Sequence, residues 1–188
     1  MKHISYLPIE LVELFKDHFV YPEKLLFGSV ATIQNNCPRI RTMRIYEFNQ
    51  DGCPILLTHT KSNKWKDFIN HRQISINIVS ESKLLQIIVS GHLVLDTSES
   101  AYETAKRYWN MVRSDVKKIY DPNHKIEEAY CESDNLIISE EPPNTFGIAC
   151  VLPSFWEALH LESEYTKSRR HQFHLKEGSW KKQRIHVG

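Results

Sequence analysis

Hydrophobic and polar positions alternate along this chain with two different periods. After Pro8, apolar residues recur every three or four positions with acidic residues between them, which predicts an amphipathic helix within residues 1–20. From residue 25 the period shortens to two, and turn residues interrupt it at intervals. This pattern predicts one short helix at 62–70 and strands at 25–33, 39–48, 55–58, 73–79 and 84–95.

The second half of the chain adds one longer helix, a polar stretch and further strands. Ser98 precedes a run of helix formers, which predicts a helix at 101–116 with Ser98 as its cap. Residues 121–144 are polar and irregular, with a helical turn expected near 126–130. The pattern then predicts strands at 146–152, 156–161, 171–175 and 180–187. Because short strands outnumber helices, the fold class is mainly β, a closed or nearly closed β-barrel with peripheral helices.

The strand predicted at 84–95 has two unlike faces. Leu85, Ile87 and Val89 alternate with Gln86, Ile88 and Ser90, so one face is apolar and the other is mixed. The apolar face predicts core, and the mixed face is typical of a ligand-lining surface. An amide in such a strand needs hydrogen-bond partners, since leaving it unpaired costs about 1–3 kcal/mol. For Gln86 these partners are either neighbouring backbone or the polar edge of a ring.

Composition and charge place few other limits on the chain. Its 188 residues suit one domain, 1–188, and 41% hydrophobic with 25% charged residues is ordinary for a globular protein. The net charge of +1 predicts no overall field that would attract nucleic acid or an acidic membrane. Acidic residues interrupt the first apolar run, and no later run approaches about 18 apolar residues. We therefore expect no signal peptide, no membrane partner and no nucleic-acid partner.

Cysteines and histidines do not fall into metal-binding spacings. The four cysteines are far apart with no CxxC pair, and the ten histidines include no HExxH motif. This spacing predicts no metal site and no disulfide framework. Reduced thiols in turn indicate a cytoplasmic location.

The stretch THTKSNKWKDFINH, residues 58–71, places hydroxyl and ammonium groups where a strand gives way to a helix. Ser62 is positioned to cap this helix, and a capped helix with a solvated face explains the pattern. The alternative is a phosphate pocket, because a helix N-terminus offers backbone N–H groups and a favourable dipole. In that case Lys64 reaches the anion.

Three arginines within six positions of a strand favour the phosphate pocket. Arg39 and Arg41 share one face of the strand at 39–48, and Arg44 takes the other. The structural explanation of these arginines is that charges on an edge strand discourage aggregation. A guanidinium fork that binds a phosphate is the functional one.

The order of these motifs resembles a known family. RTMRIYEF (41–48), a turn ending at Gly52, LLTHTKSNKWKDFINH (56–71) and QIIVSG (86–91) are similar to the core of the pyridoxamine 5′-phosphate oxidase family of FMN-binding split barrels. The resemblance covers roughly residues 20–187 and continues through Pro142–Phe146, Trp156–Leu161, Arg169-Arg170 and Trp180. It implies a Greek-key split barrel that binds FMN, with residues 98–144 as an insertion near the site.

The resemblance also assigns roles to individual residues. It implies that Arg41, Ser62 and Lys64 hold the FMN phosphate, while Gln86 reaches the flavin ring or ribityl chain. Thr42, Met43 and Arg44 would run beneath the isoalloxazine as backbone, and Leu57 and Thr58 would close on it from the next strand. Arg169 or Arg170, with Arg170 preferred, would supply a C-terminal arginine to FMN. The family's site lies at a homodimer interface, so a homodimer is implied.

The chain departs from the family where substrate binds. Tyr46 stands where the oxidases have a lysine, and Leu159 where they have a flavin-contacting tryptophan. Tyr102 and Arg107 lie in the helix that grips substrate phosphate in those enzymes, so Tyr46 and Arg107 are the candidate substrate residues. The resemblance implies an FMN-dependent oxidoreductase acting on a small molecule by hydride transfer at N5. The alternatives are a split barrel that holds FMN or haem without turnover, and one that has lost flavin and serves a structural role.

Overall fold

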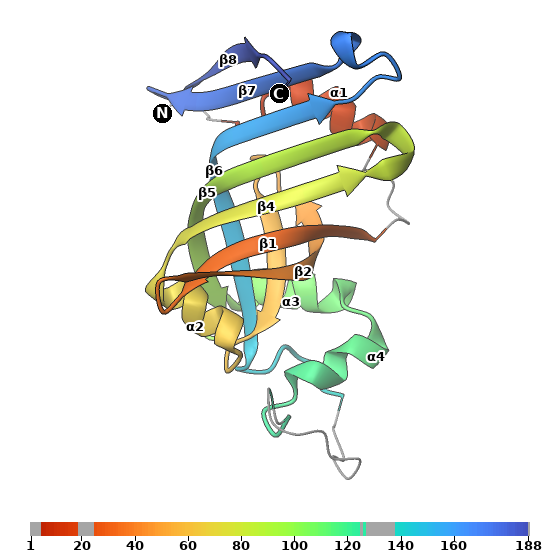
Figure 1. Ribbon diagram of the computed structural model, residues 1–188. Helices are drawn as coiled ribbons and strands as arrows, with labels where there is room; N and C mark the ends of the chain where they lie inside the picture. Colours follow the sequence, from red (N-terminus) through yellow and green to blue (C-terminus); the bar gives the residue numbers. More distant parts are fainter. Residues whose placement is uncertain (1–4, 19–24, 125, 127–137, 188) are drawn as a thin grey trace.

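The computed structural model describes residues 5–18, 25–124, 126 and 138–187, and it is built around one antiparallel sheet (Figure 1). The strands pair in the order β3-β2-β1-β4-β5-β6-β7-β8, and an additional β3–β6 pairing closes the first six into a barrel. The elements are α1 (Ile9–His18), β1 (Leu26–Gln34), β2 (Cys37–Phe48), β3 (Pro54–His59), α2 (Asn63–Asn70), β4 (Gln73–Ser80), η1 (Glu81–Lys83), β5 (Leu85–Thr97), α3 (Tyr102–Met111), α4 (Ser114–Lys117), η2 (Lys118–Tyr120), β6 (Phe146–His160), η3 (Tyr165–Lys167), β7 (Arg169–Lys176) and β8 (Ser179–Ile185).

The barrel has Greek-key connectivity. Strands β1, β2 and β3 follow one another as hairpins, and the chain then passes through α2 so that β4 pairs with β1. The resulting spatial order β4-β1-β2-β3 is that of a Greek key. The predicted β-barrel with peripheral helices and Greek-key topology is therefore confirmed.

Two apolar clusters hold the barrel together. The first fills its interior, where Val30, Ile76, Ile87 and Val89 are fully buried from the three strands β1, β4 and β5, and α1 closes one end with Leu11 and Phe15. The second lies outside the barrel wall, where α3 and η2 cover β3 and the start of β6. Its buried aromatic members are Tyr108, Trp109, Tyr120 and Phe146, and the rings of the last three meet one another in edge contacts. None of the described helices has the length and apolarity needed to cross a membrane.

The helix predicted at 101–116 is shorter than expected. It ends at Met111, Val112 is extended, and a separate turn of helix follows at Ser114–Lys117. Ser98 is not its cap, because the Ser98 hydroxyl donates to the carbonyl of Pro143 at 2.7 Å and the residue before the helix is Ala101. Residues 127–130 of the helical turn expected near 126–130 lie outside the described residues.

The two strands predicted at 146–152 and 156–161 are one continuous strand, β6. Pro153 does not end it, because the register between β5 and β6 shifts at Ser90/Gly91, directly opposite Pro153. A Cβ at Gly91 would lie 2.1 Å from the carbonyl oxygen of Leu152, so only glycine permits this close approach. The irregular ladder tolerates a proline, which sequence periodicity alone does not reveal.

Candidate functional site

A polar cavity opens where β2 passes the start of α2. It has a volume of about 350 Å³ and is lined by Gln34, Arg39, Ile40, Arg41, Asn63 and Lys64. We call it the basic cavity. Asn63 and Lys64 are the first residues of α2, so the helix N-terminus and three cationic side chains face one space. This arrangement suits an anion.

The guanidinium of Arg41 is only partly satisfied. Its Nη2 donates to Oδ2 of Asp67 at 2.8 Å, and the same oxygen accepts from the Thr32 hydroxyl at 3.2 Å. Among the described residues, Nη1 of Arg41 is buried and has no hydrogen-bond partner. A buried donor without a partner costs about 1–3 kcal/mol, and an added anionic oxygen would remove that cost.

Ser62 caps α2, as expected. Its hydroxyl accepts from the backbone N–H of Trp65 at 3.3 Å and lies 3.3 Å from the hydroxyl of Thr58. Both hydroxyl-bearing residues are buried. Ser62 and Thr58 therefore support the turn before α2, whereas Lys64 lines the basic cavity itself. A phosphate contact by Ser62 or Thr58 stays a prediction.

Side chains of β2 alternate between the two faces of the sheet, as the sequence predicted. Met43 is buried inside the barrel, whereas Thr42 is exposed and Arg44 lies on the outer face. The Arg44 guanidinium stacks 4.2 Å from the ring centroid of Tyr46, yet its Nε is buried and unpartnered among the described residues. Burial raises the pKa of Tyr46 although the Arg44 cation opposes that shift. Leu57 is buried in the second apolar cluster beneath α3.

Gln86 projects from the outer face of β5, beside an apolar hollow. Its Nε2 donates to Oδ1 of Asn77 on β4 at 2.9 Å, so the amide partner is a side chain rather than backbone. The hollow measures about 230 Å³ and includes Val79, Leu84 and Leu159. Leu159 is the residue that stands in place of the family's tryptophan, and it lies directly opposite Gln86.

Arg169 and Arg170 point to opposite faces of the sheet. Arg170 lies opposite Leu159, and its Nη2 pairs with the buried carboxylate of Glu157 at 3.0 Å. The Nε of Arg170 is buried and unpartnered within the described residues. Arg169 instead pairs with Glu162 at 3.1 Å. Of these two arginines, Arg170 is the one that shares the outer face of the sheet with Gln86.

The candidate substrate residue Arg107 is engaged by an acidic neighbour. Both of its terminal nitrogens bond Glu47 of β2, at 2.5 and 3.3 Å, and the Tyr108 hydroxyl donates to the same carboxylate at 2.7 Å. The second candidate, Tyr46, lies under Arg44 rather than beside Arg107. The two substrate residues that the resemblance suggested thus have separate partners.

The acidic partners of the arginines were not recognised in the sequence. Asp67, Glu157 and Glu47 pair with Arg41, Arg170 and Arg107 respectively. Asp67 had one available signal, since it sits beside Phe68 on the apolar side of an amphipathic helix. Glu157 had another, because it interrupts the apolar run Trp156–Leu161. Neither signal names the partner, which lies on another strand.

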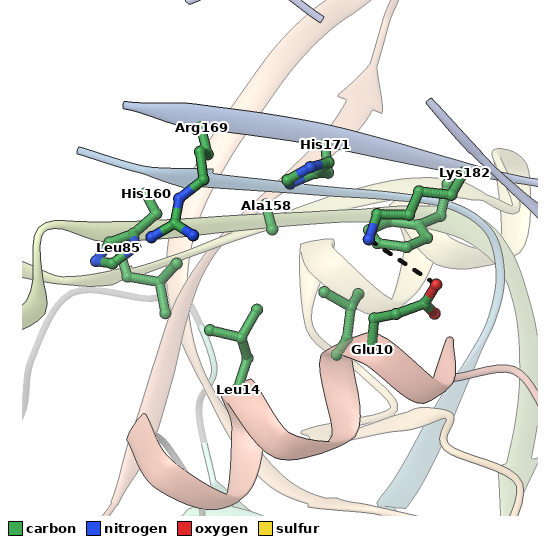
Figure 2. Close-up of a pocket in the computed structure, with 10 residues that line it drawn as sticks. Glu10, Leu14, Leu85, Ala158, His160, Arg169, His171 and Lys182 are labelled. Carbon is green, nitrogen blue, oxygen red and sulfur yellow. Dashed lines mark ion pairs between the residues drawn. The ribbon is translucent and has the colours of Figure 1, made fainter. Parts of the chain in front are cut away.

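A separate cavity of about 280 Å³ lies between α1 and the β5–β8 end of the sheet (Figure 2). Figure 2 shows Lys182 and Glu10 facing each other across it as an ion pair, 4.0 Å apart, with Arg169, His160 and His171 along its rim. Of the predicted cofactor and substrate residues, Arg169, the less favoured of the two C-terminal arginines, is the one that lines this cavity. The cavity is distinct from the basic cavity and from the hollow beside Gln86.

No protein-family model and no curated protein matches the sequence. Solved structures are similar over nearly the whole chain. A pyridoxamine 5′-phosphate oxidase-related, FMN-binding protein from Nostoc punctiforme is 18% identical, with a TM-score of 0.79 over 95% of this chain and 96% of that one. PhzG from Burkholderia lata, solved in complex with tetrahydrophenazine-1-carboxylic acid, is 16% identical, with a TM-score of 0.75 over 95% and 89%. The chain therefore has the split-barrel fold of pyridoxamine 5′-phosphate oxidase-related, FMN-binding proteins.

Proposed function

We propose that this protein is an FMN-binding flavoprotein that acts as a cytoplasmic, homodimeric oxidoreductase on a small molecule. One observation carries the proposal. Among the described residues, four buried side-chain nitrogen or oxygen atoms have no hydrogen-bond partner, and three belong to arginines expected at the cofactor: Arg41, Arg44 and Arg170. Unpaired buried donors are costly, so their occurrence at these three arginines supports binding of an anionic, polar ligand.

The basic cavity fits the phosphate end of FMN. Arg41 and Lys64 would neutralise the phosphate, with the N-terminus of α2 between them. The second guanidinium nitrogen of Arg41 would gain the acceptor that it lacks, while Asp67 keeps the side chain in place. Ser62 and Thr58 would hold the turn that orients the helix.

The hollow beside Gln86 fits a flat ring with a polar edge. Apolar residues form its floor, and the amide of Gln86 would bond the ring edge or the ribityl chain. When bound, FMN supplies hydride transfer at N5, so the protein's part is to bind, orient and exclude water. That step requires no general base from the chain, which agrees with the lack of a recognisable catalytic constellation in the sequence.

The proposed cofactor residues lie in two parts of the fold, which supports a site shared between two subunits. Arg41 and Lys64 line the cavity at α2, whereas Arg170 belongs to β7, and Figure 1 places α2 and β7 at opposite ends of the barrel. The outer face between them exposes large apolar side chains, with Phe27 48% exposed and Val79 55% exposed. A second copy packed on this face would cover these residues and bring its Arg170 to the first copy's Arg41.

Mixed dimers test this arrangement and FMN binding together. Arg41→Lys and Arg170→Lys each keep a cation beside their acidic partners, and each homodimer should bind FMN at least about tenfold more weakly. A heterodimer of the two variants should recover one tight site per dimer, because one of its sites combines both intact arginines. Two weakened sites in the heterodimer would show that both arginines serve the same subunit's site. Unchanged binding in both homodimers would overturn the proposed cofactor site.

The engagement of Arg107 by Glu47 favours a second candidate, an FMN-binding protein that does not oxidise pyridoxamine 5′-phosphate. A guanidinium already paired with a carboxylate at 2.5 Å offers little to a substrate phosphate. Peroxide release during incubation with pyridoxamine 5′-phosphate separates the two candidates. Glu47→Gln weakens the pairing of Arg107, so turnover that appears only in this variant would support the second candidate. Turnover by the unmodified protein would exclude it.

A further inference from the structure

Two cysteines lie side by side at the seam that closes the barrel. Cys150 of β6 is directly opposite Ile55 of β3, and Cys53 precedes Ile55 by two residues, so both thiols project from the same face. The Cys53 thiol lies near the sulfur of Cys150, and hydrogen bonding between them shifts the pKa of both thiols. Cys37, the other described cysteine, is exposed on β2.

The side chain of Asn49 holds both cysteines. Its Oδ1 accepts from the backbone N–H groups of Asp51 and Cys53, at 3.0 and 2.9 Å, which fixes the turn before β3. Its Nδ2 donates to Sγ of Cys150 at 3.9 Å. One amide therefore sets the position of Cys53 and places a donor against the sulfur of Cys150.

The two thiols have different reactivity. The hydrogen bond from Cys53 holds the pKa of Cys150 below its ordinary value, although burial opposes this. The same bond and burial raise the pKa of Cys53, which is 1% exposed. Cys150 is partly exposed. Since the thiolate is the nucleophile and an oxidant must reach it, Cys150 is the thiol that reacts first.

We propose that Cys53 and Cys150 form a reversible disulfide when the protein meets hydrogen peroxide. The Cys150 thiolate attacks one peroxide oxygen, the O–O bond breaks, and the departing hydroxide takes up a proton to become water, leaving a sulfenic acid. The sulfur of Cys53 then gives up its proton and attacks the sulfur of Cys150. The S–S bond forms, the S–O bond breaks, and a second water leaves. Two thiols have lost two electrons, and one peroxide has become two waters.

This bridge would join β3 to β6, the pairing that closes the barrel. It would also tie together residues 53 and 150, which are distant in the sequence, so the oxidised protein should unfold at a higher temperature than the reduced protein. A thiol reductant should reverse the change. Formation of the bridge does not depend on FMN, so it can be tested without FMN.

Mass spectrometry of the full chain tests the bridge directly. In a Cys37→Ser/Cys131→Ser background, peroxide treatment should remove two hydrogens, block alkylation of both remaining thiols and link the peptides that contain Cys53 and Cys150. Dithiothreitol should restore both thiols. Two thiols that remain open to alkylation, or an oxygen gained at Cys150 without a link, would overturn the proposal.

Two further variants test the assigned roles. In Cys53→Ala, Cys150 should form a sulfenic acid that dimedone captures, and no bridge should appear. Asn49→Asp keeps the acceptor oxygen for Cys53 but replaces the donor at Cys150 with a negative charge, so bridging should slow by at least about tenfold. An unchanged rate in Asn49→Asp would contradict the assignment of Cys150 as the first thiol to react.

Discussion

Replacement of Arg41 by lysine tests the basic cavity while preserving the fold. Arg41→Ala would remove the cation from the carboxylate of Asp67, which is 3% exposed, and leave it the Thr32 hydroxyl as its hydrogen-bond partner among the described side chains. Breaking a buried ion pair costs about 3–5 kcal/mol, reduced here because the Arg41 side chain is 23% exposed. Lysine keeps one cation for Asp67 and removes only the second guanidinium nitrogen, so a change in FMN affinity can be assigned to the phosphate contact.

The expected loss of FMN affinity follows from the one hydrogen bond that this nitrogen would donate to the phosphate. Nη1 of Arg41 is buried and has no partner within the described part of the chain, and a charge-assisted hydrogen bond to phosphate is worth about 1.5–3 kcal/mol. Its loss should raise the dissociation constant of FMN about 10- to 150-fold. Arg39→Lys is the matched control, because Arg39 lines the same cavity and its Nε bonds the neutral Gln34 side chain, and it should change affinity less than about threefold.

Titration of apoprotein with FMN, followed by quenching of flavin fluorescence, measures both constants. Thermal melts of the apoproteins establish that the variants are folded. If Arg41→Lys binds FMN within about twofold of the unmodified protein, or if Arg39→Lys loses as much affinity as Arg41→Lys, the phosphate contact assigned to Arg41 is wrong.

Three other changes test the basic cavity, the packing around Gly147 and the burial of His59. Lys64→Ala should weaken FMN binding at least about tenfold by titration, whereas Lys66→Ala should not, because Lys66 does not line the cavity and its ammonium bonds the Asn63 side chain. Gly147→Ala should lower the free energy of unfolding in urea by about 1–3 kcal/mol, because the new Cβ would lie 2.7 Å from the Trp65 ring and 3.0 Å from the Thr58 carbonyl; full stability would contradict this packing. Burial lowers the pKa of His59 from 6.5, so the unfolded state gains a proton first and stability should fall as the pH drops below about 6.5. His59→Gln should flatten this dependence between about pH 7 and pH 5.5, and an unchanged slope would show that other groups cause it.

The sequence predicts the barrel well because its strands follow local alternation. The apolar face of β5 was expected from Leu85, Ile87 and Val89, and all three are buried. The opposite directions of Arg41 and Arg44 followed from the same period of two. These features depend only on side-chain direction within one strand, so no knowledge of distant partners was required.

The features that the sequence did not reveal depend on distant contacts. The extent of β6 depends on a bulge opposite Gly91, and the pairing of Arg107 depends on Glu47, which lies 60 residues earlier. The contact between Cys53 and Cys150 likewise needs the β3–β6 closure of the barrel. Local periodicity carries no information about such partners, so the widely spaced cysteines predicted no disulfide framework.

The absorbance spectrum of the purified protein tests the central claim most directly. We expect visible flavin bands, and denaturation should release the flavin, which chromatography should identify as FMN. A haem spectrum would favour the alternative ligand. Protein that is colourless and shows no spectral change or rise in melting temperature with added FMN would contradict the proposed function.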